Sequence, residues 1–458
     1  MDYLIRFVQM HESFRQAETD AIADLEGLQM QWLHYSADAP FAIIRFTGPT
    51  GETTSAARTL IARSILATSI HELWGTGPDY PTLHTSIRAL TSAQWPAYQH
   101  TSFRFTIDSY HSSRPLASQH TLIESFAYMS FTGPIAMRNP ANHFTVFEES
   151  RLDAPTPHRL YFGRLVGASG RKQALVKYNL KKRTYIATTS MDAELSLVTA
   201  NLAQAAAGKL IYDPFMGTGS FPLACAHFGA TVFGSDLDGR SIRGQGARSV
   251  KANFEQYATA SNYLGGFVAD LTNTPLRHTR TLDGIICDPP YGVREGLKVL
   301  GSTRVALKEV VYLSDGTPAH LGANYIPPKK GYRFERMLDD VLSFAAEGLV
   351  EGGRLCMWMP VAGAGEEAEY EIPRHPALRL VSECTQDFNK WSRRLLTYAR
   401  CADGEVDADA LLAYRARRSV LSEAEIGPEV KTTANNLNAF RKRYFEGFRE
   451  RSAESRCD

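Results

Sequence analysis

The stretch from Asp288 to Tyr291, with the sequence DPPY, places a carboxylate, a rigid backbone and an aromatic ring directly after an apolar run. Asp288 can accept one N–H of an exocyclic amine, and the carbonyl of Pro289 can accept the other. Pro289 and Pro290 fix φ at about −65° and carry no N–H, so the corner is rigid and free of competing donors. Tyr291 offers a face on which an extruded base can stack. These residue types predict methylation of an amino nitrogen whose lone pair the two acceptors orient.

The apolar residues Ile285, Ile286 and Cys287 are predicted to end a strand that is buried on both faces, as strands of parallel sheets are. Asp288 then lies at the C-terminal tip of this strand, where open α/β sheets bind ligands. Cys287 precedes the tip, so we expect a buried, inert thiol there. This argues against carbon methylation through a cysteine nucleophile.

A glycine-containing turn is predicted earlier in the same half of the chain. Residues Lys209–Tyr212 form the expected strand, Gly217 and Gly219 permit a tight turn, and Ser220 is expected to cap the following helix. Asp236 follows Gly217 by about 20 residues, where Rossmann-like folds place the acid that binds a ribose. The pattern therefore predicts a nucleoside-binding turn.

Two features of the sequence indicate which nucleoside is bound: a proline in place of a fingerprint glycine, and carboxylates at successive strand ends. Pro222 occupies the position of the third glycine of a dinucleotide fingerprint, which weighs against NAD or FAD and favours S-adenosylmethionine. Carboxylates are expected at four successive strand ends on one edge of one sheet, namely Asp213, Asp236, Asp270 and Asp288. A single such Asp is more often a cap or turn residue. Four in succession predict a cofactor site.

The surrounding elements are predicted from hydrophobic spacing. Strands near residues 3–8 and 41–48, a helix near 11–30 and a second amphipathic helix over 58–75 form a small α+β unit, and 103–107 alternates as a half-buried strand. From Met191 onward, apolar strands alternate with helices, which is typical of an α/β fold. A boundary is expected between these patterns.

Composition limits the possible partners and compartments. Lys and Arg number 50 against 49 Asp and Glu, so the net charge of +1 attracts neither nucleic acid nor membrane globally. The six cysteines show no C-x-x-C pair, which indicates a reducing compartment and no metal site. The N-terminus lacks a signal sequence and no apolar run reaches about 18 residues. We expect a soluble, cytoplasmic protein without a membrane partner.

A local basic cluster lies between the two patterns. It is predicted to neutralise RNA phosphates, although a solvated linker would have the same composition. Its members are Arg171, Lys172, Lys177, Lys181, Lys182 and Arg183.

Four segments in this order resemble a known family: KKRTYIATTSM at 181–191, YDPFMGTGSF at 212–221, GSDLDGR at 234–240 and DPPYGVREG at 288–296. They are similar to the catalytic subunits of eukaryotic tRNA (guanine-10-N2)-methyltransferases, and FTGPIAMRNPANHFTVFEE at 131–149 resembles the end of a THUMP domain. The resemblance implies a Rossmann-like methyltransferase domain with a mostly parallel seven-stranded sheet, preceded by an α+β region with a THUMP-like domain.

The resemblance also implies the reaction and the site. The substrate is a guanosine at position 10 of tRNA, methylated on N2, the donor is S-adenosylmethionine, and a small zinc-binding activator completes a heterodimer. The base is held by Asp288, Pro289, Pro290 and Tyr291. The cofactor is lined by Asp213, Pro214, Phe215, Gly217, Thr218, Gly219, Asp236 and Asp270.

Pattern and resemblance together divide the chain into five expected segments. An edge strand near Phe267–Leu271 is a candidate for pairing with the activator by β-addition. The segments are an N-terminal α+β domain at 1–75, a THUMP-like RNA-binding domain at 76–165, a basic linker at 166–190, the methyltransferase domain at 191–400 and a helical C-terminal extension at 401–458.

Two other functions stay open at this point. An amino methyltransferase that acts on DNA adenine or on a protein glutamine needs the same pair of acceptors, and an RNA-docking N-terminal domain argues against both. A non-catalytic RNA-binding scaffold could keep the fold, but the intact glycines and the intact DPPY argue against it.

Overall fold

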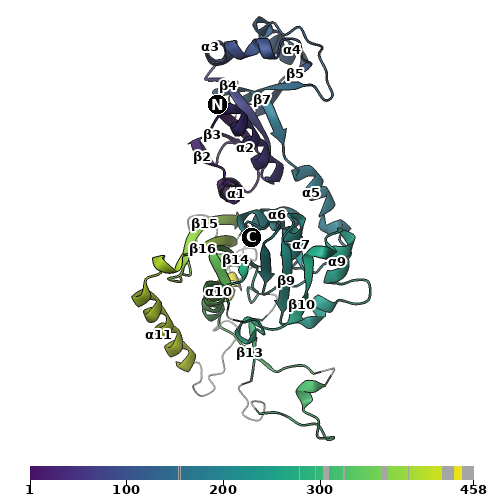
Figure 1. Ribbon diagram of the computed structural model, residues 1–458, viewed down its shortest axis with the longest axis vertical. Coiled ribbons are helices and arrows are strands. Elements are labelled where there is room, and N and C mark those ends of the chain that lie inside the picture. Colours follow the sequence, from purple (N-terminus) through teal and green to yellow (C-terminus); the bar gives the residue numbers. More distant parts are fainter. Residues whose placement is uncertain are drawn as a thin grey trace, which may run out of the picture. The chain divides into compact units, whose positions relative to one another are not determined.

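The structure is a computed structural model that describes residues 1–152, 154, 156–277, 279–293, 296–302, 309–322, 325–363, 370–389, 391–424 and 438–445. The chain divides into two compact units, Met1–Ala174 and Leu175–Asp458 (Figure 1). None of the helices within the described ranges is long and apolar enough to cross a bilayer.

The first unit is built on a seven-stranded sheet with the order β2-β3-β1-β4-β7-β6-β5. Its strand pairs are antiparallel except for β5 and β6, which are parallel. The strands are β1 (Asp2–Phe7), β2 (Met30–His34), β3 (Phe41–Phe46), β4 (Ala67–Gly77), β5 (Phe103–Tyr110), β6 (Asn142–Glu149) and β7 (Arg159–Ala168). The helices are α1 (Glu12–Leu25), α2 (Thr50–Arg63), α3 (Tyr80–Thr91) and α4 (Leu116–Glu124).

The alternation predicted for β5 is confirmed. Phe103, Phe105 and Ile107 pack against one buried cluster, which includes Trp74 and Phe144. One face of β5 therefore covers the core of this unit.

The helix predicted over 58–75 is wrong, because α2 ends at Arg63 and residues 67–77 form β4. The cause is a buried carboxylate from another helix. Glu18 on α1 accepts hydrogen bonds from Ser64 Oγ (2.9 Å), Ile65 N (3.0 Å) and Leu66 N (2.8 Å). These bonds fix the turn between α2 and β4, so a tertiary contact overrides the helical spacing of the sequence.

We predict that Glu18→Ala lowers the free energy of unfolding of the first unit by about 3 kcal/mol, because two backbone N–H groups and a hydroxyl lose their acceptor in the interior. Urea denaturation followed by circular dichroism measures the change. Glu26→Ala, at the exposed residue directly after α1, is the control and should stay within about 0.5 kcal/mol of the wild type. Equal losses in both variants would contradict this role of Glu18.

The second unit contains a seven-stranded sheet with the order β10-β9-β8-β11-β14-β16-β15. Only β16 runs antiparallel to its neighbours in this described sheet, so the predicted mostly parallel sheet is confirmed. The strands are β8 (Leu210–Asp213), β9 (Thr231–Asp236), β10 (Tyr263–Val268), β11 (Leu282–Cys287), β14 (Leu349–Ala362), β15 (Leu378–Asp387) and β16 (Trp391–Arg400). The strand order reverses between β8 and β11, which is the point where such sheets bind ligands.

Helices and a small two-stranded sheet complete this unit (Figure 1). The helix α5 begins in the first unit and ends in the second. The helices are α5 (Arg171–Lys177), α6 (Ala193–Leu202), α7 (Ser220–His227), α8 (Gly239–Arg243), α9 (Val250–Gln256), α10 (Phe334–Gly348) and α11 (Ala408–Ala424), and the antiparallel pair is β12 (Lys298–Leu300) with β13 (Lys329–Gly331).

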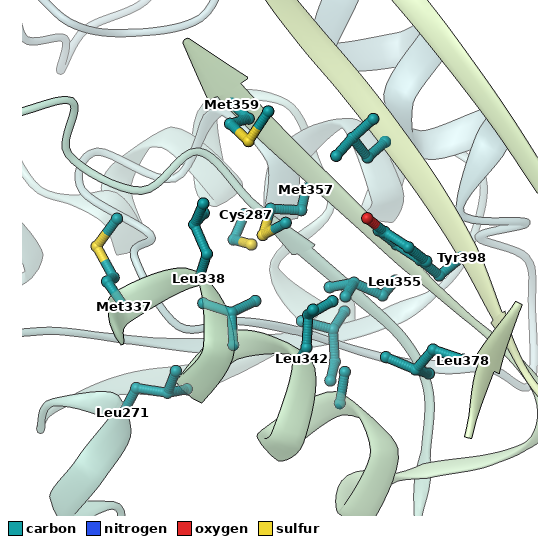
Figure 2. Packing of buried hydrophobic residues seen from close by; sticks show 14 of the residues in the cluster. Leu271, Cys287, Met337, Leu338, Leu342, Leu355, Met357, Met359, Leu378 and Tyr398 are labelled. Atoms are coloured by element: carbon teal, nitrogen blue, oxygen red, sulfur yellow. The ribbon is translucent and has the colours of Figure 1, made fainter. Parts of the chain in front are cut away.

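The apolar face of α10 packs on the sheet around β11 and β14. Figure 2 shows Leu338 and Leu342 of α10 close to Leu355 and Met357 of β14, all part of one buried cluster. Cys287 at the end of β11 belongs to the same cluster and has no exposed surface. The strand that carries Asp288 is therefore enclosed, as the sequence predicted.

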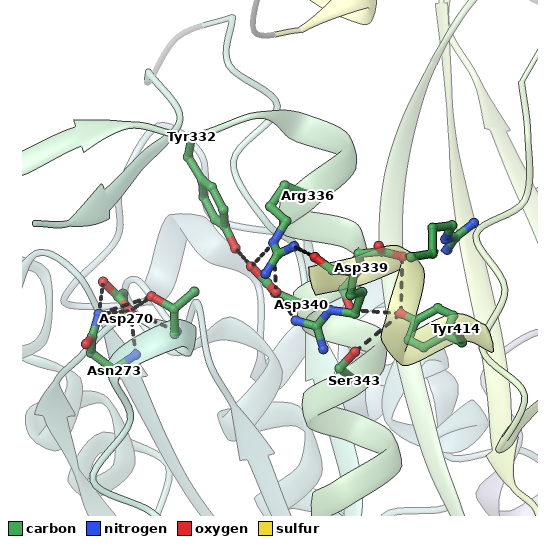
Figure 3. Close-up of polar contacts among 11 residues, drawn as sticks. Asp270, Asn273, Tyr332, Arg336, Asp339, Asp340, Ser343 and Tyr414 are labelled. Atoms are coloured by element: carbon green, nitrogen blue, oxygen red, sulfur yellow. Dashed lines mark hydrogen bonds and ion pairs between the residues drawn. The ribbon is translucent and has the colours of Figure 1, made fainter. Parts of the chain in front are cut away.

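Polar contacts attach α11 to the other side of α10 (Figure 3). Asp340 accepts from the Tyr332 hydroxyl and from Arg336 Nε, at 3.3 Å in the second case. The Tyr414 hydroxyl of α11 donates to Asp339 Oδ1 at 3.1 Å. The extension after residue 400 thus contains a helix, α11, that is attached to α10 of the second unit.

Candidate active site

The sheet brings the four predicted carboxylates to one edge. Asp213 is the last residue of β8, Asp236 is the last residue of β9, and Asp288 directly follows β11. Asp270 follows β10 after one intervening residue. Because these strands are parallel neighbours, their C-terminal ends lie along the same edge of the sheet.

The turn after β8 depends on its glycines. Gly217 and Gly219 have φ values of +49° and +81°, which L side chains rarely adopt. A Cβ at Gly219 would lie 3.0 Å from Val250 Cγ1, whereas one at Gly217 would meet nothing within 4 Å. Gly217 therefore leaves open space beside the turn, and Gly219 allows close packing beneath it.

The predicted cap at Ser220 is wrong. Gly219 is the residue that precedes α7, and Ser220 is already the first helical residue. The Ser220 hydroxyl accepts from Arg183 Nη1 at 2.8 Å. Arg183 is only 6% exposed, and burial lowers the pKa of its guanidinium. This arginine supports the start of α7 and does not face solvent.

Asp236 joins the end of β9 to the glycine turn. Its Oδ2 accepts from Gly217 N at 2.9 Å, and its Oδ1 accepts from Asp238 N at 2.8 Å. Asp236 therefore orders both the glycine turn after β8 and the turn after its own strand.

Asp213 is buried at the centre of this edge. Its Oδ1 accepts from Phe215 N at 2.9 Å. Burial raises the pKa of Asp213 well above its ordinary value, the Phe215 bond acts in the opposite direction, and the charges of Asp236 and Asp288 raise the pKa further. Loss of water outweighs the single hydrogen bond at this carboxyl.

Pro214 and Thr218 are buried parts of the same turn. The carbonyl of Pro214 accepts from Ser235 Oγ at 3.4 Å, and the Thr218 hydroxyl lies 2.8 Å from Ser190 Oγ. Ser190 belongs to the segment 181–191 quoted above, so the structure brings that segment to the glycine turn.

Asp270 caps a short 3-10 helix, η5 (Leu271–Asn273), in the manner of an ordinary cap residue (Figure 3). Its Oδ1 accepts from Thr272 N and Asn273 N, both at 2.8 Å. Its Oδ2 accepts from Leu300 N at 2.6 Å, which ties β12 to this edge. The geometry accounts for Asp270 as a structural residue, and its cofactor role stays a prediction.

In the corner after β11, the two polar side chains of the DPPY motif are hydrogen-bonded to each other. The Tyr291 hydroxyl donates to Asp288 Oδ1. Burial raises the pKa of Asp288, while the Tyr291 bond and the charge of Arg393 lower it. Burial also raises the pKa of Tyr291, and the Asp288 charge adds to this effect. The phenol therefore stays a neutral donor beside an acid that is easier to protonate than usual.

Sequence reasoning missed Arg393 and Trp391, which lie near this corner. The ring centroids of Tyr291 and Trp391 are 6.0 Å apart. Both missed residues are on β16, which reaches the corner only through its pairing with β14. No local motif indicates such a neighbour about 100 residues away, since the pairing is tertiary.

The basic cluster is mostly exposed. Lys172, Lys177, Lys181 and Lys182 have exposed side chains, on α5 and on a 3-10 helix at Leu180–Lys182. Arg171 is partly buried, and its Nη1 donates to Ile65 O at 2.9 Å. Four ammonium groups can thus reach a solvent-borne phosphate.

Comparison with known proteins identifies both units. A family model described as Tmrp11 THUMP N-terminal domain matches residues 1–171, and one described as RMKL-like, methyltransferase domain, matches residues 181–302. The chain is therefore an enzyme with a Rossmann-like methyltransferase domain preceded by a THUMP domain. The fold class predicted from the sequence is confirmed.

Relatives define the family more narrowly. The tRNA (guanine(10)-N(2))-methyltransferase of Saccharomyces cerevisiae is 44% identical over 408 residues, covering 86% of this chain and 92% of that protein. The Schizosaccharomyces pombe enzyme of the same name is 39% identical over 87% of this chain and 80% of its own length. Human TRMT11 is 32% identical over 99% and 96%. The chain belongs to the tRNA (guanine(10)-N(2))-methyltransferase family, which confirms the resemblance.

We predict that Tyr291→Phe raises the pKa of Asp288 further, because the lost hydrogen bond favours the ionised carboxyl. Carbon-13 NMR titration of labelled aspartate measures the shift, with the signal assigned by its loss in Asp288→Asn. Tyr80→Phe in the first unit is the control and should leave this signal in place. An unchanged or lower titration midpoint in Tyr291→Phe would contradict the prediction.

Proposed function

We propose that this chain transfers a methyl group from S-adenosylmethionine to N2 of guanosine 10 in tRNA, as the catalytic subunit of a heterodimer. The observation that carries the proposal is the DPPY corner at the C-terminal end of β11, next to β8 with its glycine turn. A yeast relative 44% identical to this chain is named tRNA (guanine(10)-N(2))-methyltransferase.

The residues of the sheet edge fit S-adenosylmethionine, which supplies a sulfonium methyl group when bound. Gly217 leaves open space where a Cβ would project. Asp236 lies directly at the glycine turn, where its Oδ2 accepts from Gly217 N, and its carboxylate is the proposed partner of the ribose hydroxyls. The proposed cofactor residues are Asp213, Pro214, Phe215, Gly217, Thr218, Gly219, Asp236 and Asp270.

The corner residues orient the acceptor nitrogen. The exocyclic amine of guanine is flat because its lone pair is delocalised into the ring. Asp288 and the Pro289 carbonyl each accept one N–H, which pulls the nitrogen out of the ring plane and directs its lone pair. Most of the acceleration then comes from positioning and preorganised acceptors, with Tyr291 as the stacking face and Pro290 as the rigid link.

Asp288 has a second task after the methyl group has arrived, when the nitrogen becomes acidic. Burial raises the pKa of Asp288, so this carboxylate is better suited to accept the released proton. Because the Tyr291 hydroxyl donates to Asp288 Oδ1, the amine has to displace this hydroxyl or bind the second oxygen. Displacement couples binding of the base to a rearrangement of Tyr291, whereas binding to Oδ2 leaves the Tyr291 hydroxyl in place.

The THUMP domain and the family favour tRNA over DNA adenine or a protein glutamine. Lys172, Lys177, Lys181 and Lys182 are proposed phosphate contacts because they are exposed, with Arg171 as a partly buried fifth. Arg183 is not a proposed phosphate contact, because its side chain is buried against Ser220.

The activator is proposed to pair with β10, an edge strand of the described sheet. Leu264 and Val268 of this strand are 66% and 46% exposed, and a shallow hollow beside them is lined by apolar residues such as Phe233 and Phe267. An unpaired edge with exposed apolar side chains suits β-addition by a partner.

The cytoplasmic location and the five domain bounds expected from the sequence stay predictions.

We predict that the chain, co-expressed with its activator, labels N2 of guanosine in unmodified tRNA and does not label tRNA with adenosine at position 10. Asp288→Ala should lower the rate at least about 100-fold, with cofactor and tRNA affinities within about threefold, because it removes a transition-state acceptor. Nucleoside analysis after digestion identifies the product.

Asp315→Ala, at an exposed aspartate outside the site, is the control and should keep the wild-type rate. Label on another base or on protein would contradict the substrate assignment. A fully active Asp288→Ala enzyme would contradict the mechanism.

We predict that Leu264→Asp with Val268→Asp abolishes co-purification of the activator, because charges would be buried against its apolar surface. The melting temperature of the chain alone should change little, since both side chains are exposed. Leu412→Asp on α11, 68% exposed, is the control that should retain the activator. Retention by the double variant would exclude β10 as the contact.

A further inference from the structure

A short segment near the C-terminus, residues 438–445, lies on the DPPY corner. Residues 439–445 are helical, and Asn438 precedes them with its Oδ1 accepting from Arg441 N at 3.0 Å. Asn438 is 2% exposed and Phe440 is 7% exposed. This end of the segment is therefore packed into the unit, and it lies outside residues 181–302, which the methyltransferase family model matches.

The segment donates hydrogen bonds to three successive carbonyls of the corner. Asn438 Nδ2 donates to Tyr291 O at 2.8 Å, across 147 residues of sequence. Arg441 Nη1 donates to Gly292 O, and to Val293 O at 3.1 Å. A guanidinium supplies charge-assisted bonds that are stronger than neutral ones. The path of the backbone after the prolines is thus fixed from outside the motif.

Gly292 shows how close this approach is. Its φ is +75°, and a Cβ built there would lie 2.5 Å from Asn438 Nδ2. Glycine is required for both the turn and the contact, because no side chain fits between them. Gly292, which ends the sequence DPPYG, therefore allows the close approach of the Asn438 side chain.

The same segment also contacts the ring of the proposed stacking residue. Phe440 and Tyr291 have ring centroids 6.4 Å apart with planes at 84°, and Phe440 lies 5.9 Å from Trp391. Trp391 is itself 6.0 Å from Tyr291 at 72°. Two edge-to-face neighbours restrict the orientation of the Tyr291 ring.

We propose that Asn438 and Arg441 are positioning residues for methyl transfer, and that Phe440 helps to set the Tyr291 ring against which the base stacks. This inference rests on the proposed function of the DPPY corner. Asn438 and Arg441 hold the carbonyls of Tyr291, Gly292 and Val293, so they act through the corner and do not bind the reacting atoms.

The chemistry requires this support because the acceptors of the amine must be held precisely. Pro289 and Pro290 fix their own φ angles, and Pro290 also restricts ψ of Pro289, but neither proline restricts ψ of Pro290, which sets the direction of the chain into Tyr291. Small displacements of a reacting group cost large factors in rate. Bonds to the three carbonyls that follow supply the missing constraint.

The segment could instead act only through its positive charge. Lys442 and Arg443 on the same helix are exposed, whereas Arg441 is turned to the corner carbonyls. Replacement of Arg441 by Lys keeps the charge but removes the planar guanidinium whose Nη1 donates to both carbonyls, and the ammonium of lysine ends closer to the backbone. This substitution therefore separates positioning from charge.

We predict that Arg441→Lys and Asn438→Ala each lower the single-turnover rate of tRNA methylation at least about tenfold, with the KM for tRNA and the cofactor Kd within about twofold. The enzyme is used as the full chain with its activator. Arg443→Ala, which removes an exposed charge from the same helix, is the control and should keep the wild-type rate. Thermal melting checks that each variant is folded.

Asn438→Asp extends the test because aspartate also caps a helix but cannot donate to Tyr291 O. A lowered rate with a retained melting temperature supports positioning. Wild-type rates for Arg441→Lys, Asn438→Ala and Asn438→Asp would overturn the inference while leaving the proposed function intact. A wild-type enzyme that does not methylate tRNA would instead remove the proposed function.

Discussion

A carboxyl group at the end of a wholly enclosed strand is the constraint on which the catalytic half of the molecule depends. Ile285, Ile286 and Cys287 have no exposed surface, and β11 is paired in parallel with β8 and β14 on either side. Asp288 therefore leaves the sheet at a fixed point. The same burial raises the pKa of its carboxyl, and the Tyr291 hydroxyl offsets part of that cost. Burial at the end of β11 therefore both fixes the position of Asp288 and raises the pKa of its carboxyl group.

The neighbouring carboxyl groups lie at the same sheet edge, where ionised acids repel each other. Asp213, Asp236 and Asp270 each accept a backbone N–H from the turn that follows their strand. These bonds order the turns, which is the ordinary structural role of such residues. The extent differs between the residues, because Asp270 Oδ1 accepts from both Thr272 N and Asn273 N as a cap does, whereas Asp213 Oδ1 accepts from Phe215 N. The same carboxyl groups that order the turns are the ones proposed to line the cofactor.

The predictable part of the fold and site is the part encoded by local pattern. Strand ends at Asp213 and Asp236, and the corner at Asp288, follow from apolar runs and turn residues near in sequence. The errors arose where a distant side chain decides the outcome: Glu18 ends α2 early, and Arg183 takes the Ser220 hydroxyl. The spacing of residues within a helix does not indicate which distant side chains will contact it.

The surroundings of the corner were missed for the same reason, and they divide the site into two sides. The proposed cofactor side is formed by the turns that follow β8 and β9. The proposed base side is surrounded by Trp391 on β16 and by Asn438 and Phe440, which follow α11 in the sequence. Trp391 lies on β16, and Asn438 reaches the Tyr291 carbonyl across 147 residues of sequence. Because these contacts are non-local, no motif near the corner indicates them, although they restrict the same tyrosine that follows the two prolines.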